Sequence, residues 1–514
     1  MVRKPVRRAV TGAMILLGLA GAACNSDRMT SPGTGPLRAS AKFPTIMLPA
    51  GYEIEKVVGG LTYPTALTFD DQGRMYVAEA GGAFLDLPPV ARILRVANGQ
   101  ATEVLSLEDK GIAPSLVGLT WHNGAFYVSH RDPTNRTGAV SRVTLGGQIT
   151  RILSGIMDSQ AEHQVNDIKI GPDGRMYLAT GPATNAGVVG LDLAPFVKLS
   201  PGVHTTPCQD IVLRGVNFRT PDFRTPDPSD LAETGAYQPF GTPSTPGQRV
   251  PGTKKCGGSV LVFDPNNAEA TVTPYASGLR NTIGLSFNAR GELYAGVNGY
   301  DIRGSRSLND EFDPVYRIQQ GAWYGWPDFS ARFEPATDAK FRVPVSQQAP
   351  AFLNGQPLPT DRVAFVIDHA ASNLHTPDQS VIYGLHPVNS SPSGIDFSPA
   401  TFGAFGGQLF VAEWGDLTPP TNPLRDAKVG SRVTRDLGNG RVEPFLQNAK
   451  SGPASEQGAA GMGLERPFYV KFGPDGAMYV VDYGVARINP TLMGTPYEFP
   501  PNTGAIWKVT RTGQ

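Results

Sequence analysis

Apolar and polar residues alternate along six short stretches of the chain, and each stretch is interrupted by a turn that contains glycine. In the first copy, residues 66–69 alternate, Gly73 ends the turn, and 75–77 is apolar and aromatic. Alternation with a period of two on both sides of a short turn predicts a β-hairpin, and the Asp-Gly or Asn-Gly pairs at several turns supply the positive φ required there. The six copies occupy residues 66–77, 118–128, 167–178, 284–294, 394–411 and 469–480.

The hairpins are accompanied by further strand-like pieces, for example 140–143, 260–263 and 506–509. A repeated hairpin with flanking strands is typical of propeller blades, which bury their faces against their neighbours around a central channel. A pair of β-sandwiches would not repeat one hairpin six times. We therefore predict an all-β, six-bladed β-propeller with two long, turn-rich insertions at about 182–255 and 329–377.

The first residues predict an export signal. Within 1–23, four basic residues precede an apolar run that is shorter than the ~20 residues of a membrane-spanning helix, which predicts a signal peptide. The run ends in a sequence that resembles the bacterial lipobox, in which Cys24 would be acylated; ordinary cleavage near Ala23 is the alternative. A flexible linker follows within 24–42, and the propeller occupies 43–514. We expect an exported protein of a bacterial cell envelope, periplasmic or held at the membrane only through a lipid anchor.

Composition and charge narrow the possible partners. The chain has 60 glycines and 46 prolines together with many aromatic residues, which indicates turn-rich structure and not disorder. Its formal net charge is zero and no basic stripe is present, so we expect no nucleic-acid partner. Cys208 and Cys256 are predicted to form a disulfide, the default for such a pair in an exported protein. A metal site is the weaker interpretation, because companion ligands at the usual spacing are missing.

The repeat also points to a candidate site. Equivalent positions in a pseudo-symmetric propeller form a ring at one end of the channel. A ring with a potential base, a cation and a carboxylate fits a small polar ligand at the channel mouth. Loops are polar by default, so solvated or capping roles remain the alternative. Counting back seven residues from the second apolar residue of each hairpin gives Thr62, Pro114, His163, Arg280, Ser390 and Glu465.

Several of these residues lie in motifs that resemble the soluble glucose and sorbosone dehydrogenases. The motifs are 162–168 with the following 171–177, 275–285 around Leu-Arg-Asn, and Tyr-Gly-Trp-Pro at 324–327. The last two are fairly specific together. The resemblance runs from about Leu48 to the C-terminus and is interrupted by the two insertions.

The resemblance implies a six-bladed propeller that holds pyrroloquinoline quinone (PQQ) over its channel mouth. It implies that His163 is the general base, taking the proton of a sugar hydroxyl while hydride passes to the quinone; a neutral imidazole suits this near neutral pH. Arg280 and Asn281 would contact carbonyl and carboxylate oxygens of the cofactor, where a guanidinium matches a developing anionic oxygen.

The resemblance further implies two calcium sites. The backbone carbonyls of Gly299 and Tyr300 fall where the family holds a calcium ion beside the cofactor. Glu311 and Tyr324 match positions near a second, structural calcium. Calcium prefers oxygen ligands, including backbone carbonyls, so both assignments are chemically sensible.

The chain departs from the family at two places. The glucose-oxidising members have an aspartate that orients the base where Pro182 stands here, and Asn185 or Glu162 are the candidates to replace it. A cofactor-contacting lysine after the fifth hairpin is not evident. Arg432 and Arg435 are predicted to supply that charge from the next loop. These departures place the chain nearer the sorbosone-type branch.

The sequence therefore predicts quinone-dependent oxidation of a small sugar or aldehyde, with PQQ, Ca²⁺ and a downstream electron acceptor. A calcium-dependent lactonase-like propeller is one alternative, although Glu465 and Asp301 are few for its carboxylate-rich channel mouth. A non-catalytic envelope propeller that binds glycan or protein is another, because fold does not fix function. The joint presence of His163, Arg280 and Asn281 favours the dehydrogenase.

Overall fold

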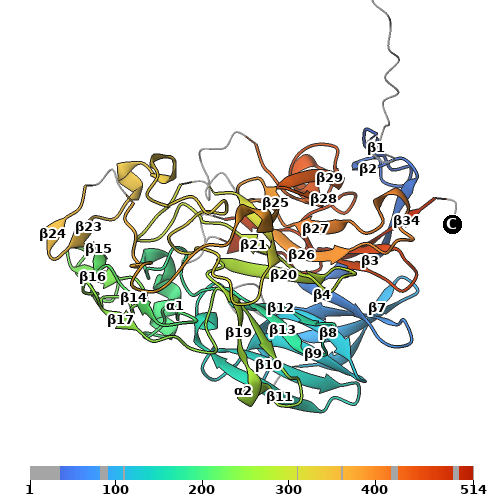
Figure 1. Ribbon diagram of the computed structural model, residues 1–514. Coiled ribbons are helices and arrows are strands. Elements are labelled where there is room, and N and C mark those ends of the chain that lie inside the picture. Colours follow the sequence, from blue (N-terminus) through green and yellow to red (C-terminus); the bar gives the residue numbers. More distant parts are fainter. Residues whose placement is uncertain are drawn as a thin grey trace, which may run out of the picture. The chain divides into compact units, whose positions relative to one another are not determined.

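The computed structural model describes residues 35–81, 91–107, 110–309, 311–359, 363–417, 427–489 and 497–512. The chain divides into two units, Met1–Thr34 and Gly35–Gln514. The predicted signal peptide and Cys24 therefore lie outside the described residues. The second unit is nearly all-β (Figure 1). Within its described part, no helix is long and apolar enough to cross a membrane.

Six antiparallel sheets carry the six predicted hairpins. The first three are β4–β7, β8–β11 and β12–β13–β18–β19. Their strands are β4 (Pro64–Phe69), β5 (Met75–Glu79), β6 (Arg92–Ala97), β7 (Gln100–Ser106), β8 (Ala113–His122), β9 (Ala125–Arg131), β10 (Gly138–Thr144), β11 (Ile149–Ile156), β12 (Val165–Ile170), β13 (Met176–Thr180), β18 (Ser259–Phe263) and β19 (Thr273–Ser277).

The other three sheets follow the same plan. One is β20–β21–β22–β25, one is β26–β29 extended by β2 and β1, and one is β30–β31–β34–β3. Their strands are β20 (Asn281–Phe287), β21 (Leu293–Asn298), β22 (Asp313–Ile318), β25 (Ile382–His386), β26 (Pro392–Phe397), β27 (Leu409–Glu413), β28 (Arg432–Gly438), β29 (Arg441–Asn448), β2 (Ile46–Leu48), β1 (Arg38–Ala39), β30 (Pro467–Phe472), β31 (Met478–Asp482), β34 (Gly504–Arg511) and β3 (Tyr52–Leu61).

The hairpin predictions are confirmed, because each copy forms the first antiparallel pair of its sheet: β4–β5, β8–β9, β12–β13, β20–β21, β26–β27 and β30–β31. The first strands of successive sheets lie side by side, and β30 contacts β4, so the six strands close a ring. Glycine permits this close approach: a Cβ on Gly284 would come within 2.1 Å of the Ser393 carbonyl oxygen. The final sheet joins both ends of the described unit, since β3 pairs with β34.

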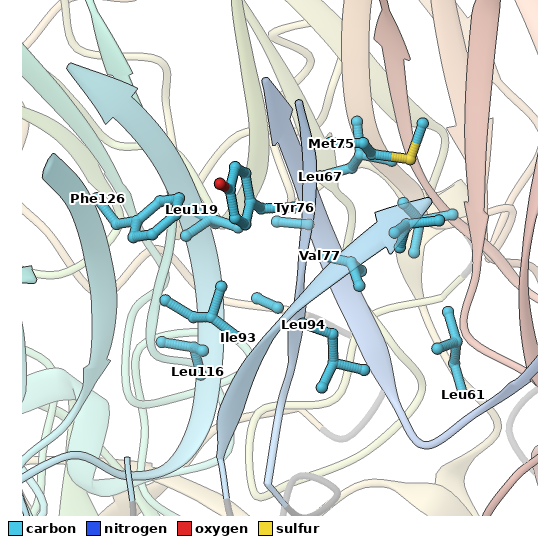
Figure 2. Packing of buried hydrophobic residues seen from close by; sticks show 14 of the residues in the cluster. Leu61, Leu67, Met75, Tyr76, Val77, Ile93, Leu94, Leu116, Leu119 and Phe126 are labelled. Carbon is cyan, nitrogen blue, oxygen red and sulfur yellow. The ribbon is translucent and has the colours of Figure 1, made fainter. Parts of the chain in front are cut away.

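Apolar side chains fill the space between neighbouring sheets. Leu67, Val77, Ile93, Leu119 and Phe126 belong to one buried cluster, and each is 1% exposed or less (Figure 2). Ile93, Leu119 and Phe126 pack between the sheet of β4–β7 and the sheet of β8–β11, whereas Leu67 and Val77 lie on the other face of the sheet of β4–β7. Removing one such side chain leaves a cavity and costs about 2–5 kcal/mol, so this packing stabilises the ring.

The two predicted insertions combine into shared structure. The first contributes β14 (Ile211–Val212), β15 (Val216–Pro221), β16 (Leu231–Gly235) and β17 (Arg249–Val250), and the second contributes β23 (Ala351–Leu353) and β24 (Gln356–Pro357). β15 pairs with β23, which joins the insertions in one sheet, seen beside the main sheets in Figure 1. The remaining named elements, apart from short 3-10 turns, are two short helices and one strand pair. The helices are α1 (Ala194–Leu199) and α2 (Ala268–Thr271), and the strand pair is β32 (Arg487–Ile488) with β33 (Tyr497–Glu498).

Candidate active site

A cavity of about 350 Å³ opens where the first strands of the six sheets begin. Every one of these strands contributes to its wall at or near its N-terminal end: Thr65 of β4, Ser115 of β8, Asn166 of β12, Asn281 of β20, Ser393 of β26 and Phe468 of β30. The cavity therefore lies on the axis of the ring, where the sequence repeat predicted a site.

Only two of the six positions given by the repeat line this cavity among the described side chains, and they are His163 and Arg280. The side chain of Pro114 lies outside the described part. The other three point to local partners: Thr62 Oγ1 donates to Asn502 Oδ1 (3.1 Å), Ser390 Oγ to Asp313 Oδ2 (3.3 Å), and Glu465 accepts from Ser455 Oγ (2.7 Å). The predicted carboxylate of the ring is thus absent from the cavity wall.

His163 presents one ring nitrogen as a hydrogen-bond acceptor. It lies just before β12 and is 7% exposed. Its Nδ1 lies 2.9 Å from the Pro182 carbonyl oxygen, which can only accept, so Nδ1 carries the proton and Nε2 keeps its lone pair. Burial, together with the positive charges of Arg280 and Arg303, lowers the pKa of His163 well below its usual value. The imidazole is therefore neutral at pH 7.

Arg280 and Asn281 stand beside this base. Arg280 Nη2 donates to Asn185 Oδ1 (2.8 Å) and pairs with Asp301 Oδ2 (2.7 Å), while its Nε is buried and has no hydrogen-bond partner in the described residues. Gly181 allows the close packing, because a Cβ there would come within 2.4 Å of Asn281 Oδ1 and 2.6 Å of His163 Cβ. The base, the guanidinium and the amide thus face one cavity.

Arg303 was missed by sequence reasoning. Its guanidinium pairs with Glu162 (2.9 Å), Asp192 (2.8 Å) and Asp301 (3.1 Å), and its Nη2 lies 3.5 Å from His163 Nε2. The two arginines hold the pKa of Asp301 at about 2. Its position along the chain could have indicated it, because Arg303 follows Asp301 by two residues in a stretch already assigned to the site.

The expected replacements for the orienting aspartate do not fill that role. Asn185 bonds to Arg280, and Glu162 pairs with Arg303, so neither of these side chains takes the His163 Nδ1 bond. The prediction that one of them would do so was wrong. The backbone carbonyl of Pro182 accepts that bond instead, in the very position where a side-chain carboxylate was expected.

Part of the cavity wall is aromatic. Trp414, Phe468, Tyr483 and Tyr497 line it, and the Trp414 and Tyr483 rings pack edge to face with centroids 6.3 Å apart. Flat aromatic faces of this kind suit the C–H faces of a sugar ring or a planar cofactor.

Arg432 and Arg435 lie away from the cavity. Both belong to β28, the third strand out from the ring. Arg432 Nε pairs with Glu413 Oε2 (2.5 Å), and the Arg435 guanidinium lies 4.8 Å from the centre of the Phe405 ring. The structure therefore gives the predicted cofactor contact of these two arginines no geometric support.

The four residues assigned to calcium line one smaller cavity of about 20 Å³: Gly299, Tyr300, Glu311 and Tyr324. The Tyr300 hydroxyl donates to the Phe329 carbonyl oxygen (2.9 Å). Glu311 Oε2 is buried with no hydrogen-bond partner in the described part of the chain, and burial raises the pKa of this carboxyl well above its usual value. That same part contains no cluster of three or more His, Cys, Asp or Glu side chains suited to a metal.

The two predicted disulfide cysteines are bonded to each other. Cys208 and Cys256 form a disulfide with Cα atoms 5.0 Å apart. Cys208 lies inside the first insertion, and Cys256 directly follows the insertion and precedes β18. The bond therefore closes the part of the insertion from Cys208 onwards into a loop that ends beside β18.

No protein-family model matches the chain, and no curated protein matches its sequence. Among solved structures, an enzyme of Carbohydrate-Active Enzymes Family AA12 from Trichoderma reesei is 16% identical, with a TM-score of 0.50 over 93% of this chain and 100% of that chain. The PQQ-bound aldose sugar dehydrogenase of Streptomyces coelicolor is 17% identical (TM-score 0.47; 90% and 99% covered). The PQQ domain of pyranose dehydrogenase from Coprinopsis cinerea is 15% identical (0.48; 91% and 97%). What the chain shares with the Trichoderma enzyme is the fold.

Proposed function

We propose that this chain is a quinone-dependent dehydrogenase that oxidises an aldose or sugar aldehyde in the axial cavity. In this proposal the six sheets are the blades of a six-bladed propeller, the chain belongs to the sorbosone-type branch, and PQQ and Ca²⁺ are its cofactors. The observation that carries the proposal is His163, a neutral buried imidazole whose Nδ1 donates to a carbonyl and whose Nε2 is an acceptor in the cavity, where its contact is a long hydrogen bond from Arg303 (3.5 Å).

The residues on the axis fit the proposed cofactor at its reacting edge. Arg280 Nε is a buried donor with no partner in the described residues, and an anionic oxygen would satisfy it. Arg280 and Asn281 would hold the quinone. When bound, PQQ would supply the two-electron acceptor for hydride. The unpaired Glu311 Oε2 likewise fits a hard cation that prefers oxygen ligands at the proposed structural calcium site, and the carbonyls of Gly299 and Tyr300 would serve the proposed calcium site beside the cofactor.

The chain's own residues then divide the work. His163 Nε2 takes the proton of the substrate hydroxyl, which makes the adjacent C–H bond a hydride donor. Arg280 and Arg303 disfavour the imidazolium, and the Asp301 carboxylate offsets part of that repulsion. The aromatic wall orients the sugar ring by stacking on its C–H face.

A glycan-binding propeller without catalysis is the second candidate. The observation that favours it is the aromatic wall of Trp414, Phe468, Tyr483 and Tyr497, because an aromatic platform beside polar side chains binds sugars without any chemistry. This candidate predicts that sugars bind the chain in the absence of any cofactor.

A cofactor titration separates the two candidates. The chain lacking residues 1–24 is mixed with PQQ and Ca²⁺, binding is followed by absorbance, and dye reduction is measured over a panel of aldoses. We expect binding and turnover, with turnover lost in His163→Ala. His204→Ala is the matched control, because His204 Nδ1 also bonds a carbonyl, that of Gly202 (2.7 Å), but lies outside the cavity. Sugar binding without any PQQ binding would contradict the dehydrogenase and favour the binding propeller.

We also propose export and lipid anchoring through Cys24. The support is the basic and apolar start of the sequence and its lipobox-like end. Labelling cells with a radioactive fatty acid should mark the wild-type chain and leave Cys24→Ser unlabelled. Equal labelling of the two chains would contradict the anchor.

A further inference from the structure

One peptide group links His163 to a buried carboxylate. The carbonyl of Pro182 accepts from His163 Nδ1 (2.9 Å). The N–H of Ala183 donates to Asp158 Oδ1 (2.9 Å). The C=O of residue 182 and the N–H of residue 183 belong to the same planar peptide unit, so the imidazole and the carboxylate hold its two ends.

Burial and hydrogen bonds from neighbouring residues hold Asp158 in this position. It is fully buried, and in the described residues it has no salt-bridge partner. An unpaired buried carboxylate is costly unless hydrogen bonds replace its water. Thr206 supplies two, from its backbone N–H (3.2 Å) and its Oγ1 (2.6 Å). Gly257 supplies a further backbone hydrogen bond, and its lack of a side chain matters because a Cβ there would come within 2.2 Å of the carboxylate.

We infer that Asp158 is the positioning carboxylate of His163 and acts on it through the Pro182–Ala183 peptide. Its negative charge polarises the N–H, which strengthens the carbonyl of the same peptide as an acceptor. A stronger acceptor holds the proton on His163 Nδ1 and keeps the lone pair on Nε2. The chain thereby keeps a carboxylate behind its base although Pro182 replaces the side chain expected there.

The charge on Asp158 changes near neutral pH. Burial, offset in part by its hydrogen bonds, raises its pKa to about 7, so the carboxylate is ionised above that pH and protonated below it. The buried Tyr237 hydroxyl is the titratable group that senses Asp158, while Arg280, Arg303 and Asp301 face His163. The inferred positioning of the imidazole is therefore strongest above about pH 7.

The test measures the tautomer and the chemical shifts of the His163 imidazole and does not depend on turnover. The whole chain, with its disulfide intact, is labelled with ¹⁵N-histidine, and long-range ¹H–¹⁵N spectra are recorded from pH 5 to 9. His163→Gln identifies the signals. We expect the Nδ1–H tautomer above pH 7 and a step in the His163 shifts near pH 7. Asp158→Asn should lose the step and gain Nε2–H tautomer. An unchanged tautomer and an unchanged step in Asp158→Asn would overturn the inference.

Thr206→Val is the second variant, and it serves if Asp158→Asn does not fold. It removes the hydroxyl that lowers the pKa of Asp158 but retains the carboxylate. The step should move to higher pH, with the Nδ1–H tautomer retained above it. A step that stays in place in Thr206→Val would contradict the inference.

The inference rests on the proposed role of His163 as the base, but its test can fail or succeed separately. A chain that shows the expected step and tautomer but never reduces dye would support the effect of Asp158 on His163 and contradict the proposed reaction. A chain that oxidises sugar although His163 does not respond to Asp158→Asn would support the reaction and contradict the effect of Asp158 on His163.

Discussion

Two buried histidines of this chain hold opposite protonation states. His163 contacts a backbone carbonyl and lies beside two guanidinium groups, which lowers its pKa well below the usual value. His386, at the end of β25, is fully buried between Glu413 Oε1 (2.8 Å from Nδ1) and Asp436 Oδ2 (3.1 Å from Nε2). These carboxylates raise the pKa of His386 to about 10.

The difference shows that charge and hydrogen bonding, not burial alone, decide what a histidine does. Desolvation disfavours the imidazolium at both sites. At His386, two carboxylates overcome that penalty and make the residue a fixed cation inside a polar cluster that also contains Arg432. At His163 no carboxylate of the described part of the chain contacts the ring, so the imidazole stays neutral and its Nε2 can accept a proton.

The largest expected effect is on stability. His386→Ala leaves Glu413 and Asp436 buried without their shared partner, and breaking a buried ion pair costs about 3–5 kcal/mol. His163→Ala should cost clearly less, because it strands no buried charge. Urea unfolding of both variants measures the difference. Equal losses of unfolding free energy would break the comparison.

The pH dependence of stability should follow His386. Its folded pKa, about 10, lies above the unfolded value of about 6.5. Its contribution is therefore fully present below about pH 6.5 and is lost as the pH rises through 10. The gap in unfolding free energy between wild type and His386→Gln should shrink from pH 6 to pH 10. A gap that widens over this range would show that His386 is not a stabilising cation.

The base should respond to its neighbouring cations. Arg303→Gln removes a positive charge 3.5 Å from His163 Nε2, so the pKa of His163 should rise towards its usual value. The acid limb of dye reduction should then move to higher pH. Arg175→Gln, which loses a surface pair with Asp173 and a contact with Tyr177 outside the cavity lining, is the matched control and should leave the limb in place. A limb unmoved in Arg303→Gln would contradict the electrostatic account of His163.

The smallest effect is expected at Arg435. Because this side chain packs on Phe405 outside the cavity, Arg435→Gln should change the free energy of PQQ binding by less than about 0.5 kcal/mol. The cofactor titration measures this directly. A loss of PQQ binding as large as that expected in Arg280→Gln would show that Arg435 contacts the cofactor after all.

The sequence was sufficient where structure is local. Alternation with a period of two and glycine turns specify each hairpin within a single segment of 11 to 18 residues, so all six hairpins were predicted. The pairing of β15 with β23 joins segments far apart along the chain, and no local pattern encodes it. The position of Arg432 was misjudged for a related reason: order after a hairpin does not reveal that β28 lies third from the ring.

The site was predictable for two side chains in repeat register and for Asn281, which the family resemblance added. His163 and Arg280 occupy equivalent positions before two hairpins, and both line the cavity. The partner of His163 Nδ1 is the backbone carbonyl of Pro182. Every residue type has such a carbonyl, so the sequence could not show that Pro182 supplies the hydrogen-bond acceptor in place of the expected aspartate. Asp158 acts through that same peptide and stands five residues before the base without any motif to mark it.

The most direct test of the account is the rate at which an aldose reduces bound PQQ in a single turnover, followed by absorbance in wild type and in His163→Ala. The account predicts that His163→Ala slows this step about 10²–10⁴-fold, the usual contribution of a general base, while PQQ affinity stays unchanged. Equal rates in the two chains would contradict it.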